Sequence, residues 1–90
     1  MTRLVFVGPH AALAAALRPG AAFTGAAPEG AVAEAIDEID APPPRPAAPA
    51  AGDAVVDTAA WGLPEPVGMC LEEVRELRAV IEMRVRQLPR

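Results

Sequence analysis

A proline-rich segment in the middle of the chain limits what this sequence can fold into. Residues 41–52 read APPPRPAAPAAG, with five prolines in twelve positions. Proline has a fixed φ angle and no backbone N–H, so the segment is excluded from a helix interior and from a central strand. We predict an extended, polyproline-type linker over residues 41–52.

The same segment also fits a Pro-rich recognition motif, because Pro43 and Pro46 have the spacing PxxP. We favour the linker, since the chain is rich in Ala, Gly, Pro and Arg and has no Lys. That bias indicates a GC-rich genome, in which such a stretch carries little information.

The residues before this segment have the pattern of two β-α units. The apolar run Leu4–Val7 ends at Gly-Pro and predicts a buried strand, and Ala11–Arg18 predicts a helix that Pro19-Gly20 ends. Residues Ala21–Thr24 predict a weak second strand. A second helix is expected over Gly30–Ile39, where the apolar residues have helical spacing. A strand followed directly by a helix is typical of an α/β fold.

The last third carries the strongest periodicity. A short strand is expected over Asp53–Thr58 and a rigid loop over Trp61–Gly68. Beyond it a long amphipathic helix is expected, with i,i+4 pairs Arg78–Glu82 and Glu82–Arg86 on its polar face. Its apolar stripe consists of Leu71, Val74, Leu77, Ile81, Val85 and Leu88.

Taken together, these elements predict a single small α/β domain over residues 1–90. We expect a three-layer-like arrangement with a short parallel sheet of about three strands and a long C-terminal helix. Alanine supplies 21 of the 47 apolar residues, so the core is expected to be small. Three short strands would cover little of the final helix, which predicts an exposed stripe and association through it, as a homodimer or with another protein.

Charge and residue counts exclude several classes of function. The net charge of −4 argues against nucleic acid as a partner. One Cys and one His exclude an internal disulfide and a structural zinc site, and no metal or other cofactor is expected. No apolar run is long enough to span a membrane or to form a signal peptide, so we expect a cytoplasmic protein.

The end of the chain resembles a known family. Residues 61–68 (WGLPEPVG), followed by LEEVR at 71–75 and IEMRV at 81–85, are similar to the end of the low-molecular-weight protein tyrosine phosphatases, especially their bacterial arsenate-reductase branch. Residues 4–7, 24–28 and 31–40 are more loosely similar to that family's first strand, its following turn and its second helix. The resemblance implies an α/β fold with an anion-binding loop after the first strand.

The family's catalytic residues are not matched here. Its nucleophilic Cys, its anion-binding Arg and the hydroxyl residue after it correspond to Gly8, Ala14 and Ala15. Its general acid, the Asp of Asp-Pro, corresponds to Glu65. The resolving cysteines of the arsenate reductases are absent, and residues 41–60 are too few for the family's middle part. Val55 and Val56 therefore match either the third or the fourth family strand.

Two further residues have both a functional and a structural interpretation. His10 lies in the degenerate loop and could bind an anion, although a plain loop or capping role is favoured. Cys70 precedes the final helix, where the family has Ser or Thr; a thiol there can be reactive, but a substituted cap residue is favoured. Trp61 is expected to anchor the core rather than to stack on a ligand.

We therefore expect a truncated, catalytically inactive relative of this family that acts through protein association. A residual phosphatase or arsenate reductase using Cys70 or Glu65 is the alternative from a different functional class. A decayed gene product without a selected role is a third hypothesis, which the sequence does not separate from the first.

Overall fold

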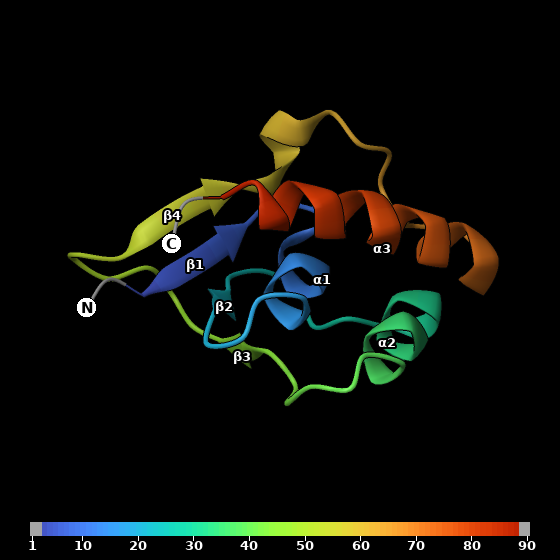
Figure 1. Cartoon of the computed structure of the whole chain (residues 1–90), viewed down its shortest axis with the longest axis horizontal. Helices are drawn as coiled ribbons and strands as arrows, with labels where there is room; N and C mark the ends of the chain where they lie inside the picture. The colour runs from blue at the N-terminus through green and yellow to red at the C-terminus, as the bar shows by residue number, and fades with distance from the viewer. Residues whose placement is uncertain (1–2, 89–90) are drawn as a thin grey trace.

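Strands and helices follow one another in the order expected for an α/β fold. The computed structural model describes residues 3–88. In chain order the elements are β1 (Leu4–Val7), α1 (Ala11–Ala16), β2 (Ala22–Phe23), α2 (Gly30–Asp37), β3 (Arg45–Pro46), β4 (Ala54–Asp57), the 3-10 helix η1 (Thr58–Trp61) and α3 (Leu71–Arg86) (Figure 1). The predicted α/β class, with a parallel sheet and a long C-terminal helix, is confirmed.

The sheet has four parallel strands in the order β3-β2-β1-β4, one more than expected. The additional strand, β3, comes from the proline-rich segment and pairs with β2 through Ala22 opposite Arg45 and Phe23 opposite Pro46. It lies at the edge of the sheet, where the missing N–H of Pro46 costs no ladder bond. The proline-rich segment is thus excluded from a central strand, as predicted, but not from the sheet.

The three helices form one layer on one face of the sheet. Helix α1 contacts β1, β2 and both other helices, and α2 contacts α3. Phe6 and Phe23 share this face and belong to the same buried cluster as the helices. Figure 1 shows α3 lying along α1 and reaching α2.

The opposite face of the sheet has no helix among the described residues. Side chains alternate along a strand, so Val5 points away from the face that carries Phe6. Val5 is nevertheless fully buried. The connection from edge strand β3 to edge strand β4, residues 47–53, has to cross the sheet, and Figure 1 shows it passing β1. Arg3, on the Val5 side of β1, donates to the Ala48 carbonyl at 3.4 Å and to Asp53 at 2.8 Å, which holds this crossover in place.

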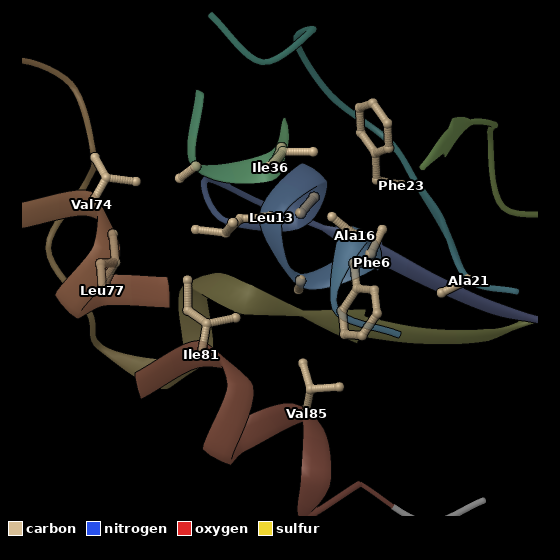
Figure 2. Close-up of a cluster of buried hydrophobic side chains, with 14 residues drawn as sticks. Phe6, Leu13, Ala16, Ala21, Phe23, Ile36, Val74, Leu77, Ile81 and Val85 are labelled. Atoms are coloured by element: carbon tan, nitrogen blue, oxygen red, sulfur yellow. The ribbon is translucent and has the colours of Figure 1, made fainter. Parts of the chain in front are cut away.

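The core combines an alanine helix with larger side chains from its neighbours. Five of the six α1 residues are buried, and four of those five are alanine. Their small side chains allow α3 to approach closely and to fill the space with its own larger residues. Figure 2 shows Leu77, Ile81 and Val85 projecting from α3 towards Leu13 and Phe6. Trp61 packs edge-on against Phe6 with ring centroids 6.3 Å apart, as expected for a core anchor.

The expectation that the stripe of α3 forms an exposed patch is wrong. Val74, Leu77, Ile81 and Val85 are at most 6% exposed within the single chain, and Leu71 and Leu88 are half-buried against the same core. Helices α1 and α2, and not the strands alone, cover the stripe. The stripe is therefore packed against other elements of the same chain.

Glu38, just after α2, joins this helix to α3 through two arginines. Its carboxylate accepts from Arg75 Nε, 3.0 Å from both oxygens, and from Arg78 Nη1 at 2.8 Å. Arg78 also donates to the Ala35 carbonyl at 2.7 Å, so the predicted pair with Glu82 does not form; Glu82 instead pairs with Arg86 at 3.1 Å. The hydrogen bonds from Arg75 and then Arg78 lower the pKa of Glu38 to about 2.

Replacing Glu38 by Gln is expected to destabilise the fold at neutral pH and to change its pH dependence. Because the folded-state pKa of Glu38 lies below its ordinary value of 4.5, its contribution is complete above that value and is lost as the pH falls towards 2. The urea midpoints of wild type and Glu38→Gln should therefore converge in this window. Asp37→Asn changes an adjacent exposed residue and is the control. Equal urea midpoints for wild type and Glu38→Gln at pH 7 would show that Glu38 does not stabilise the contact between α2 and α3.

Replacing Ile81 by Ala tests the packing of α3 on α1. Ile81 is fully buried, so its truncation is expected to lower the free energy of unfolding by about 2–5 kcal/mol. Met83 lies two residues further along the same helix and is 64% exposed, so Met83→Ala should change it by less than about 0.5 kcal/mol. Urea unfolding followed by circular dichroism measures both. Similar small losses for the two variants would show that the stripe is not part of the core.

Candidate functional site

The sheet order places a topological switch point between β1 and β4. The chain steps outward from β1 to β2 and β3 on one side, and then returns to place β4 on the other side of β1. In open α/β sheets, ligands bind in the crevice at the carboxyl ends of the two strands that flank such a point. Here those ends are Val7 and Asp57, which are paired in the sheet, and the residues that follow them are Gly8 and Thr58.

Gly8 closes this crevice. Its φ angle is +94°, which L side chains rarely adopt. A β-carbon placed on it would lie 2.7 Å from Thr58 Oγ1 and 3.1 Å from both Ala59 N and Asp57 Oδ1. The backbone of β1 therefore turns directly against the end of β4, and position 8 has no room for a side chain.

The hydroxyl of Thr58 holds the two segments together. Thr58 is fully buried and donates through Oγ1 to the Val7 carbonyl at 2.7 Å, while the same oxygen accepts from His10 N at 3.1 Å. One side chain thus joins the end of β1, the start of α1 and the start of η1. Asp57 Oδ1 accepts from Ala59 N at 2.9 Å and so caps η1.

A pocket of about 300 Å³ lies beside this closed crevice. It is walled by the loop into α1, by the β2–α2 loop with the start of α2, and by Pro66 and Val67. Its lining residues are predominantly apolar, among them Leu13, Phe23 and Val32. They include no Arg, and the acidic residue among them is Glu29. This lining suits an apolar group, because an oxyanion would meet a carboxylate and no Lys or Arg side chain.

His10 lies in the pocket wall but is not aimed at solvent. It is 2% exposed, and its Nε2 lies 3.4 Å from the Leu63 carbonyl. Its Nδ1 is buried without a hydrogen-bond partner in the described part of the chain. The imidazole therefore packs between the start of α1 and the loop after η1.

The structure separates the residues that the resemblance in the sequence would assign to a single active site. Gly8 and His10 line the pocket, but Ala14 and Ala15 are buried in the α1 core, and Ala14 is fully inaccessible. Glu65 is exposed and lies next to the pocket residue Pro66, without lining the pocket itself. A longer side chain at position 14 would have to displace the core rather than reach a ligand.

Cys70 stands at the N-cap of α3, as its position before the helix predicted. Its backbone N–H donates to Glu73 Oε1 at 3.2 Å, and the hydrogen bonds from Cys70 lower the pKa of Glu73. The thiol is exposed and does not line the pocket. Cys70 therefore lies at the N-terminal end of α3 and outside the lining of the pocket.

Across residues 3–88, no three His, Cys, Asp or Glu side chains gather closely enough to hold a metal ion. In the same range, no helix has both the length and the apolar character to cross a bilayer.

Comparisons with known proteins add no family. No family model, no curated protein and no solved structure matches the chain.

Sequence reasoning missed Thr58 and Asp57, which organise the carboxyl end of the sheet. A signal was present, since Asp-Thr directly follows the apolar pair Val55-Val56, where polar residues commonly mark the functional end of a parallel strand. Glu29 was also missed; it lines the pocket and is the N-cap residue of α2.

Substitution of Gly8 by Ala tests the closed crevice. Gly20→Ala is the matched control, because Gly20 has φ +82° but nothing within 4 Å of an added β-carbon. The control should lose about 1–2 kcal/mol of stability from backbone strain alone. Gly8→Ala should lose a further 1–3 kcal/mol or so, because its methyl group displaces the buried Thr58 hydroxyl from its hydrogen bonds. Equal losses in urea unfolding would mean that the crevice is open.

Proposed function

We propose that this chain is a catalytically inactive relative of the low-molecular-weight phosphatases and arsenate reductases that acts by associating with another protein. One observation carries the proposal: the pocket beside the end of β1 is lined by neither a thiol, which is the nucleophile of this family, nor a guanidinium, which is its anion-binding cation. Chemistry on an oxyanion needs both, the first to form the covalent intermediate and the second to hold the charge.

The contact at Gly8 supports this proposal independently. A nucleophile directly after β1 would require a side chain where Thr58 Oγ1 already fills the space. The buried position of Ala14 likewise leaves no path from α1 to the pocket for an arginine head group. The chain therefore packs closely around the small residues at both positions.

Association is expected to use surfaces other than the stripe of α3, which is buried in the chain itself. Exposed large apolar side chains lie elsewhere. They are Val55 on β4, Val67 at the pocket and Val80 and Met83 on the outer side of α3. Single exposed residues of this kind are ordinary on a protein surface, so none of them alone marks the partner site.

The proposal predicts no turnover of the family's substrates. Wild type, Cys70→Ser and Glu65→Gln should all leave an aryl phosphate unhydrolysed and arsenate unreduced in the presence of thiols, at the level of buffer alone. Inorganic phosphate should also leave the melting temperature unchanged, since an anion that bound the folded state would raise it. Activity that disappears in either variant would establish the residual enzyme instead and overturn the proposal.

A further inference from the structure

The proline-rich segment lies on the surface with a three-residue pattern of burial. Between residues 41 and 50, only Pro44 and Ala47 are half-buried, and they are three positions apart. All other residues of this stretch are exposed. A polyproline II helix has three residues per turn, so a segment in this conformation that rests on a protein surface buries every third residue.

One exposed edge of this segment is formed entirely by proline. Pro43, Pro46 and Pro49 share the three-residue spacing and are all exposed. At a rise of about 3.1 Å per residue they form a ridge about 19 Å long. We refer to these three residues as the proline ridge.

The ridge is held in place by the rest of the fold. Ala47 N donates to the Phe23 carbonyl at 2.9 Å, and Thr24 Oγ1 donates to the Ala47 carbonyl at 2.6 Å. Arg3 donates to the Ala48 carbonyl. These bonds already fix the backbone of the segment. Binding of a partner to the ridge therefore costs the segment less conformational entropy than binding would cost a free peptide.

The chemistry of the segment selects one kind of partner. An exposed edge strand ordinarily invites pairing with another strand, but proline offers no N–H donor, so β3 and its flanks are poor templates for strand addition. Proline rings and free carbonyls are instead recognised by grooves lined with aromatic side chains. Arg45 lies between two ridge prolines and is exposed, and its side chain forms no hydrogen bond or ion pair with any described residue, so an acidic residue beside such a groove would complement it.

We infer that the proline ridge is a docking surface for a protein domain whose groove is lined by aromatic residues and flanked by an acidic one. This inference rests on the proposed association function and specifies its surface. It also explains the arrangement of the proline-rich segment, in which three prolines are exposed while Pro44 and Ala47 are half-buried.

The test titrates the full-length, isotope-labelled chain with a purified SH3 domain and, separately, with a purified WW domain. Amide signals of Arg45, Ala47 and Ala48 should shift, while those of α3 should not. Pro43→Ala combined with Pro49→Ala should weaken binding by about tenfold or more, the size typical of losing a principal contact. Pro64→Ala, an exposed proline outside the segment, should bind as the wild type does.

Arg45→Glu gives a second readout. It should weaken binding several-fold at low ionic strength, and the difference should shrink as salt is added.

Unchanged spectra outside residues 41–50 show that each variant remains folded. Absence of shifts with both domains at millimolar concentration, or shifts that persist in the double proline variant, would overturn the inference. Such a result is distinct from failure of the proposed function, which the turnover assay detects without any binding partner.

Discussion

The contact between Gly8 and Thr58 sets the geometry of the carboxyl end of the sheet. The Thr58 hydroxyl donates to the Val7 carbonyl at the end of β1 and accepts from the backbone N–H of His10, which precedes α1. The end of β1 and the start of α1 are therefore fixed to the same side chain. This contact requires the absence of a side chain at position 8 and a positive φ angle there. The switch point, which in other open α/β sheets receives a ligand, is consequently filled by the chain itself.

The position of α1 follows from this fixed start, and the remaining core is built around it. An alanine helix contributes little apolar area, about one methyl group per residue. It allows close approach, however, and α3 fills the resulting space with four buried aliphatic residues. Glu38 then ties α2 to α3 at the surface. On the other face, Arg3 ties the crossover 47–53 to the start of β1, on a side of the sheet that no described helix reaches.

The sequence predicted the elements better than their environment. Helical and strand periodicities identified α2, α3, β1, β2 and β4 to within a few residues, because those patterns depend on local spacing. The burial of the α3 stripe was not predictable in this way, since its cover comes from helices more than 30 positions earlier in the chain. Likewise, Gly8 read as a lost nucleophile, and only the approach of Thr58, fifty residues away, shows why glycine is required there. The edge strand β3 was missed because its two residues carry no strand pattern.

Hydrogen exchange of the His10 backbone amide tests the closed switch point most directly. In the structure this N–H is buried and donates to Thr58 Oγ1. It should therefore exchange only through the opening that unfolds the whole domain, with the same free energy as the most protected amides of β1. Adding inorganic phosphate should not change its rate. Rapid exchange typical of a free loop amide, slowed by phosphate, would show an open anion-binding loop and would contradict the account.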